Sequence, residues 1–171
     1  LLLGGAGVRD AALIWAGRIA AKTGCMLRSE FNSPRLQRGA GRVAPQRVPY
    51  VVDSALALLK DLRHIVLAGA KPPVGFFAYP GKPSVLAPPS CAFSALAGVQ
   101  DDIAAALEAL ADELGARATP PAQVAQRAAS IALREGPITL DGVAEVLGAL
   151  IPEDAIVVDE AVTTGRGFAR F

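Results

Sequence analysis

Short apolar runs alternate with longer amphipathic stretches along most of this chain, and this alternation constrains the fold more than any other feature. The short runs predict buried strands, and the longer stretches repeat apolar residues at helical spacing. Strands that alternate with helices favour a parallel sheet with helices on both faces. We therefore expect an α/β fold, a Rossmann-like parallel sheet of about five or six strands over residues 1–116.

The pattern assigns each element to a range. Gly24 is expected to end the first helix, since glycine often follows a helix C-terminus. The polar, arginine- and proline-rich stretch between residues 29 and 50 is expected to be irregular. The expected strands are Leu1–Leu3, Cys25–Leu27, His64–Ala68 and Pro83–Leu86, and the expected helices are Val8–Thr23, Val51–Leu62 and Gln100–Leu114.

A second domain is expected to begin near residue 137. Residues 117–136 are predicted to form a linker and a connecting helix, Gln123–Arg134. A helix, Asp141–Leu150, and a strand, Ala155–Val158, follow. Because strand-like sequence lies at both ends of the chain, we expect these residues to be an internal fragment of a larger protein.

Composition narrows the class of protein. The chain has 171 residues, of which 52% are hydrophobic and 19% charged, a balance that excludes disorder. The net charge of +1 gives no case for nucleic acid as a partner. No apolar run approaches the ~20 residues of a membrane span, so no membrane is expected as a partner. Cys25 and Cys91 are interpreted as reduced core thiols, which favours a cytoplasmic location.

Glycines after the first strand suggest a nucleotide site. Gly5 and Gly7 fit the start of a G-x-G-x-x-G fingerprint, in which glycines admit a phosphate at a helix N-terminus. The third fingerprint position is Asp10, and Glu30 is expected to lie beyond the end of the second strand. A tight turn without any ligand is the alternative interpretation.

The segment after the third strand lies at the same predicted edge of the sheet. Gly69, Ala70 and Lys71 would join Gly5 and Gly7 in a dinucleotide site there. Aromatic residues between positions 76 and 79 could stack on a nucleotide, cap the edge of the sheet or dock another subunit. The arginines between residues 28 and 47 could bind an anion or form a solvated or packing surface. His64 is expected to be structural, and no group of residues has metal-ligand spacing.

The most suggestive site lies near the end of the chain. Glu160, Thr163 and Thr164 follow the predicted strand, where hydroxyls and free backbone N–H groups suit a diphosphate. The alternative is an ordinary polar loop. No residue of the chain is expected to be catalytic or to bind a metal.

In their order along the chain, these segments resemble thiamine-diphosphate-dependent decarboxylases and carboligases. The group includes acetolactate synthase large subunits and benzoylformate decarboxylase, and the resemblance covers nearly the whole chain. The segments that carry it are Gly4-Gly5-x-Gly7, Ser33-Pro34-Arg35-Leu36, Val66-Leu67-Ala68-Gly69-Ala70-Lys71 and Ile156-Val157-Val158-Asp159-Glu160.

The resemblance implies a role for each part. Residues 1–116 resemble the family's central domain, which carries FAD in some members. Residues 137–171 resemble the start of the domain that binds thiamine diphosphate, so Glu160, Thr163 and Thr164 would contact that cofactor. The family's catalytic glutamate and its Mg²⁺-binding G-D-G…N element would lie outside this chain. The full-length enzyme would make or break carbon–carbon bonds of 2-oxo acids as a homodimer or homotetramer, and the fragment alone would be inactive.

Two segments depart from the acetolactate synthase pattern. The family's Gly-Met-His-Gly stretch is replaced here by residues 37–42, and its Gly-Ala-Arg-Phe-Asp-Asp-Arg stretch by residues 69–74. Both stretches contact FAD in flavin-containing members, so these departures argue against FAD here and favour an empty or degenerate site, with bound FAD as the alternative.

Two other functions compete with this interpretation. One is a nucleotide-binding regulatory or scaffold domain without catalysis, and a gene without a G-D-G…N segment after Phe171 would favour it. The other is an NAD-dependent dehydrogenase. The incomplete fingerprint and the lack of an obvious catalytic histidine argue against the dehydrogenase.

Overall fold

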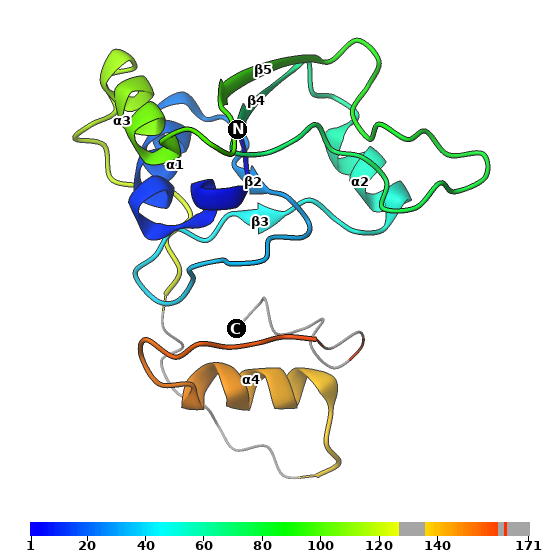
Figure 1. The fold of residues 1–171 in the computed structure, drawn as a ribbon. Coiled ribbons are helices and arrows are strands. Elements are labelled where there is room, and N and C mark those ends of the chain that lie inside the picture. The colour runs from blue at the N-terminus through cyan, green and yellow to red at the C-terminus, as the bar shows by residue number, and fades with distance from the viewer. Residues whose placement is uncertain (127–135, 161–162, 164–171) are drawn as a thin grey trace. The chain divides into compact units, whose positions relative to one another are not determined.

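The computed structural model describes residues 1–126, 136–160 and 163, which belong to two compact units (Figure 1). The first unit is Leu1–Gln126, and the second begins at Arg127. Each unit is described separately below.

A parallel sheet of five strands forms the centre of the first unit (Figure 1). The strands are ordered β3-β2-β1-β4-β5, and every neighbouring pair is parallel. This confirms the expected Rossmann-like α/β fold. The strands are β1 (Leu2–Leu3), β2 (Arg28–Ser29), β3 (Gln46–Arg47), β4 (His64–Ala68) and β5 (Ala92–Ala97).

The helices cover both faces of this sheet. Successive strand residues point to opposite faces, and here Leu3 packs with α1 and α3 while Leu2 packs with α2. The helices of the unit are the 3₁₀ helix η1 (Gly5–Val8), α1 (Asp10–Thr23), α2 (Val52–Leu59) and α3 (Ile103–Glu113).

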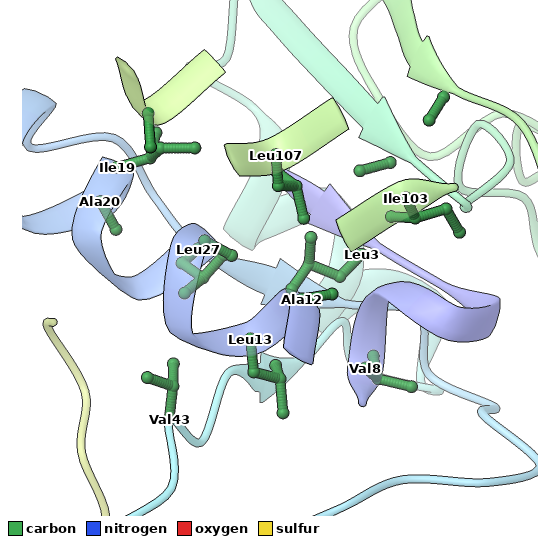
Figure 2. Packing of buried hydrophobic residues seen from close by; sticks show 14 of the residues in the cluster. Leu3, Val8, Ala12, Leu13, Ile19, Ala20, Leu27, Val43, Ile103 and Leu107 are labelled. Carbon is green, nitrogen blue, oxygen red and sulfur yellow. The ribbon is translucent and has the colours of Figure 1, made fainter. Parts of the chain in front are cut away.

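The larger core lies between the sheet and the pair α1 and α3 (Figure 2). Leu107 of α3 is fully buried, and Ile103 is 1% exposed. Burying a side chain of this size contributes roughly 1.5–3 kcal/mol relative to leaving it in water. The other members in Figure 2 include Leu3, Val8, Ala12, Leu13, Ile19, Ala20, Leu27 and Val43.

Two crossovers between parallel strands have no helix. The segment between β2 and β3 packs Val43 into the core under α1, and the segment between β4 and β5 packs Leu86 and Cys91 under α2. These irregular connections cover sheet surface that a helix usually covers in such folds.

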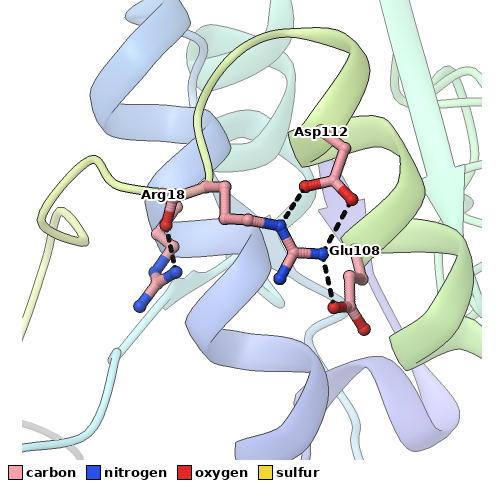
Figure 3. Close-up of polar contacts among 4 residues, drawn as sticks. Arg18, Glu108 and Asp112 are labelled. Carbon is pink, nitrogen blue, oxygen red and sulfur yellow. Dashed lines mark hydrogen bonds and ion pairs between the residues drawn. The ribbon is translucent and has the colours of Figure 1, made fainter.

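Arg117, which follows α3, joins α3 to α1 (Figure 3). Its guanidinium donates to Glu108 Oε1 and to Asp112 Oδ2, both at 2.7 Å. The same guanidinium lies 5.1 Å from the centre of the Trp15 ring, and that of Arg18 lies 4.8 Å from it. Arg18 also donates to the backbone carbonyl of Arg117. This cluster holds the start of the following segment against α1.

Two expected strands of the first unit are wrong in position. The expected strand Pro83–Leu86 makes only one isolated antiparallel bridge, between Val74 and Val85. The strand that follows β4 in parallel register is instead β5, whose sequence Ala-Phe-Ser-Ala-Leu-Ala has none of the β-branched residues that mark strands. β2 lies just after the expected Cys25–Leu27, and β3 lies in the stretch expected to be irregular.

The expected helices of the first unit are confirmed with shorter bounds. β4 matches the expected strand in full, and Gly24 ends α1 in the left-handed conformation, with φ of 72°. Gln123–Gln126, the start of the expected connecting helix, is not helical, because Val124 bridges to Val43 and Ala125 N donates to Arg42 O at 2.9 Å. The rest of that expected helix, residues 127–135, lies outside the described residues.

The second unit contains the helix α4 (Leu140–Leu150). Thr139 caps α4, since its hydroxyl accepts from Gly142 N at 3.1 Å. The expected strand Ala155–Val158 is wrong among the described residues, because no strand is assigned there and Ile156 is 93% exposed.

Candidate functional site

The five residues predicted to bind a dinucleotide lie at one edge of the sheet. Gly5 and Gly7 belong to η1, directly after β1, while Gly69, Ala70 and Lys71 directly follow β4. β1 and β4 are neighbours in parallel register. The strand order also reverses between them, which is the position where doubly wound sheets bind nucleotides. Whether these five residues bind a ligand stays a prediction.

The glycines at this edge are required by the chain's own packing. A Cβ on Gly69 would lie 2.5 Å from Gly4 O, and Gly69 has φ of +66°, which disfavours other residues. A Cβ on Gly7 would lie 2.8 Å from Ala68 O. The turn after β1 therefore lies directly against the end of β4. This contact accounts for the glycines without any ligand.

Glu30 directly follows β2, which corrects the expectation that it lies beyond the usual acidic position. Its backbone N–H donates to Leu3 O at 3.0 Å, so it still pairs with the end of β1. Its Oε1 accepts from Lys71 N at 2.9 Å. Sequence reasoning missed Glu30 because β2 is formed by Arg28 and Ser29, which are not apolar. The sequence carries no local signal for this strand, because Ser29 is polar although it is only 1% exposed in the structure.

The first turn of α1 already has protein partners. Asp10 N donates to Gln37 Oε1 at 2.7 Å, and the Asp10 carboxylate pairs with Arg42 Nε at 2.7 Å. Arg9 Nε also donates to Gln37 Oε1, at 3.2 Å. The segment between β2 and β3 thus supplies an acceptor and a cation to the helix terminus where an anion would otherwise bind.

The other arginines of the predicted anion-binding segment are partly engaged as well. Arg28 donates to Gln46 Oε1 across the β2–β3 pair. Burial lowers the pKa of Arg38, and the charge of Arg47 lowers it further. These contacts fit a packing role, and binding of an external anion is untested.

The aromatic residues at this edge form a cluster. Phe31, which follows Glu30, lies 5.6 Å from Tyr50 and 5.7 Å from Phe76, measured between ring centres. Phe76 in turn contacts Phe77, which contacts Tyr79. Phe76 and Phe77 are 54% and 59% exposed. The rings join the loop after β4 to the segment after β2, and their roles in stacking on a nucleotide, capping the sheet edge or docking a subunit stay predictions.

The opposite edge of the sheet carries an apolar pocket of about 210 Å³. Leu1, Met26 and His64, which line it, lie at the starts of strands rather than at their ends. His64 Nε2 is 2.9 Å from Ser94 Oγ on the neighbouring strand, in agreement with the structural role expected for it. This pocket is at the edge away from the one where such sheets bind ligands.

The predicted thiamine diphosphate site lies in the second unit. Glu160 and Thr163 are exposed, and Thr164 lies outside the described residues. The Glu160 carboxylate and the Thr163 hydroxyl are therefore both accessible to a ligand, and their binding of thiamine diphosphate stays a prediction. Among the described residues, no three His, Cys, Asp or Glu side chains are grouped to hold a metal ion.

One comparison with known proteins found a similar sequence. The chain is 44% identical over 168 residues to the protein named "Putative acetolactate synthase large subunit IlvX" of Mycobacterium tuberculosis. The match takes in 96% of this chain and 31% of that relative. The chain is acetolactate synthase-like in sequence. No protein-family model and no solved structure matches it.

This likeness supports the resemblance drawn from the short motifs, since its alignment takes in 96% of the chain. The chain spans less than a third of the relative's length, so the likeness carries no assignment of the relative's activity to these residues. In the part of the chain that the structure describes, no helix is both long and apolar enough to span a bilayer.

Proposed function

We propose that these residues belong to a larger thiamine-diphosphate- and Mg²⁺-dependent enzyme that forms or cleaves carbon–carbon bonds of 2-oxo acids. The observation that carries the proposal is the 44% identity over 96% of the chain to a protein named as an acetolactate synthase large subunit. The five-stranded parallel sheet supports it, since the resemblance implies such a fold for residues 1–116. The enzyme would act in the cytoplasm as a homodimer or homotetramer.

In this proposal the first unit is a scaffold and the second unit contributes to the cofactor site. Bound thiamine diphosphate would supply carbanion stabilisation, chemistry that no protein side chain provides. Thr163 and Thr164 would donate their hydroxyls to the diphosphate, and Glu160 would accept a hydrogen bond from the cofactor. The rest of the site, including the metal ligands and the catalytic glutamate, would come from residues outside these 171.

The test is an assay of the full-length protein with a panel of 2-oxo acids, with and without thiamine diphosphate and Mg²⁺. We expect turnover only when both are present, and no turnover from the 171 residues alone. Activity that does not need thiamine diphosphate, or activity of the isolated chain, would contradict the proposal. Tight nucleotide binding without turnover of any 2-oxo acid would favour the scaffold alternative.

A pair of variants tests the residues assigned to the cofactor. Thr163→Val and Thr164→Val keep the size of each side chain and remove its hydroxyl donor, so each should raise the thiamine diphosphate concentration needed for half-maximal activity. Thr119→Val makes the same change in the first unit and should leave that concentration unchanged. If all three variants needed the same thiamine diphosphate concentration for half-maximal activity, Thr163 and Thr164 would not bind the cofactor.

A further inference from the structure

The point where the strand order reverses should open into a crevice between the ends of β1 and β4. Here the two ends are joined directly. Gly4 N donates to Ala68 O at 3.0 Å, and Gly69 packs so closely on Gly4 that no Cβ fits between them. A dinucleotide that crossed the sheet edge would have to lie above this contact.

The side chain of Glu30 occupies that position. Glu30 follows β2, yet its Oε1 reaches the backbone N–H of Lys71 beyond β4. Because β1 lies between β2 and β4, the side chain crosses the end of β1 on the way. Its Oε2 lies over Gly4, only 2.5 Å from where a Cβ of that residue would stand. One carboxylate thus connects the ends of three adjacent strands.

In dinucleotide-binding sheets an acidic residue at the end of the second strand accepts hydrogen bonds from a ribose of the ligand. The carboxylate of Glu30 instead accepts a hydrogen bond from the protein backbone and lies across the crevice. A ligand diphosphate at the same place would clash with the Glu30 side chain and would be repelled by its negative charge. Asp10 adds a second carboxylate at the start of α1, where Gln37 already accepts from the helix terminus.

We propose that Glu30 closes the crevice between β1 and β4 and thereby excludes a dinucleotide diphosphate such as that of FAD. The same carboxylate substitutes for the ligand as the partner of the Lys71 N–H. This inference goes beyond the proposed carbon–carbon chemistry and does not depend on it. It concerns binding to the first unit, which can be measured without thiamine diphosphate or substrate.

The test measures FAD and ADP binding to the complete 171-residue chain by equilibrium dialysis and flavin fluorescence. Wild type should not bind either nucleotide at micromolar concentrations. Glu30→Ala should bind both at least tenfold more tightly than wild type, because it removes the carboxylate and opens the crevice. Glu30→Gln keeps the shape of the side chain but removes its charge, so its nucleotide affinity should increase less than that of Glu30→Ala. Glu113→Ala removes an acidic residue from α3 and should behave like wild type.

A second measurement reports on the crevice directly. Amide hydrogen exchange at Lys71 should be faster in Glu30→Ala than in wild type, since the variant removes the acceptor, and Glu30→Gln should retain protection. Stoichiometric FAD binding by wild type would overturn the proposal. Weaker nucleotide binding by Glu30→Ala than by wild type would also overturn it, since Glu30 would then recognise the ligand. Unchanged binding in every variant would show that another feature closes the crevice.

Discussion

Two helices of equal length, α3 in the first unit and α4 in the second, have very different surroundings. Each has 11 residues, and each begins at a side-chain cap, Asp102 or Thr139. α3 buries Ile103, Leu107 and Ala111, whereas among the residues of α4 only Ala144 is buried. The difference shows that an apolar stripe predicts a helix but not its burial, which requires partners from other elements.

The apolar residues of the second unit exceed what its described part buries. Leu150 is 75% exposed and Val158 is 79% exposed, although both belong to stretches that look like core in the sequence. In the first unit, the apolar faces of the helices are covered by the sheet and by crossover segments from distant parts of the chain. The predictions below test this contrast.

The largest expected effect comes from truncating one leucine in each helix, Leu107 in α3 and Leu147 in α4. Leu107→Ala should lower the free energy of unfolding of the first unit by about 2–5 kcal/mol, because Leu107 is fully buried. Leu147→Ala should cost less than about 1 kcal/mol, since Leu147 is 47% exposed. Urea unfolding followed by fluorescence of Trp15, the single tryptophan, reports on the first unit. Amide hydrogen exchange of α4 reports on the second unit. Equal losses of stability in Leu107→Ala and Leu147→Ala would contradict the difference in burial between α3 and α4.

A pair of glycines tests how far tight packing extends toward the sheet edge. Gly69 and Gly24 have similar φ angles, +66° and +72°, so alanine should cost each about 1–2 kcal/mol from backbone strain. At Gly24 nothing lies within 4 Å of the new Cβ, whereas at Gly69 the backbone carbonyl of Gly4 lies at 2.5 Å. Gly69→Ala should therefore lose about 1–3 kcal/mol more than Gly24→Ala. Similar midpoints in thermal unfolding would mean that the β1–β4 contact is loose.

The helix caps give a smaller effect that also differs between the units. Asp102→Ala removes the acceptor of Ala105 N in α3 and should cost about 1 kcal/mol of the unfolding free energy reported by Trp15. Thr139→Ala removes the corresponding acceptor in α4 and should speed amide exchange there, while the Trp15 transition stays unchanged. A shift of the Trp15 transition in Thr139→Ala would show that the two units unfold together.

The sequence predicted the architecture where local pattern and burial coincide. β4 is an apolar run that follows His64 and matches the predicted strand at its full length, and Gly24 marks the end of α1. The residues of β2 and β3 are polar, and β5 contains no β-branched residue, so no local pattern predicts these strands. Pairing with neighbouring strands gives them their structure. Such pairing depends on segments distant in sequence, which no local pattern contains.

The same limit applies to the candidate site. The glycines after β1 and β4 were recognisable, because turns at strand ends carry a local signature. Glu30 was not, because its role depends on the register of β2 and on a backbone N–H more than 40 residues away along the chain, at Lys71. A short motif also does not reveal that Gly4 and Gly69 lie against each other.

The smallest predicted effect concerns the exposed ion pair at the end of α3. Hydrogen bonding from Arg117 lowers the pKa of Asp112 below its ordinary value of 3.8, with a further contribution from the charge of Arg117. Since the folded-state pKa is the lower one, the contribution of Asp112 to stability is present above pH 3.8 and is lost as the pH falls through the folded-state value. Because both side chains are largely exposed to water, the unfolding transition itself should move little.

The pKa of Asp112 is best measured by NMR titration of its carboxyl carbon. In Arg117→Gln this pKa should rise toward 3.8, because the hydrogen-bond donor is removed. As a control, Lys22→Gln removes a cation from the last turn of α1 and should leave the pKa of Asp112 unchanged. Added salt should raise the pKa of Asp112, because it screens the charge of Arg117. A pKa of Asp112 that does not respond to Arg117→Gln would mean that Arg117 does not engage Asp112 in solution, and the contacts of Arg117 with α1 would then depend on Arg18 and Trp15.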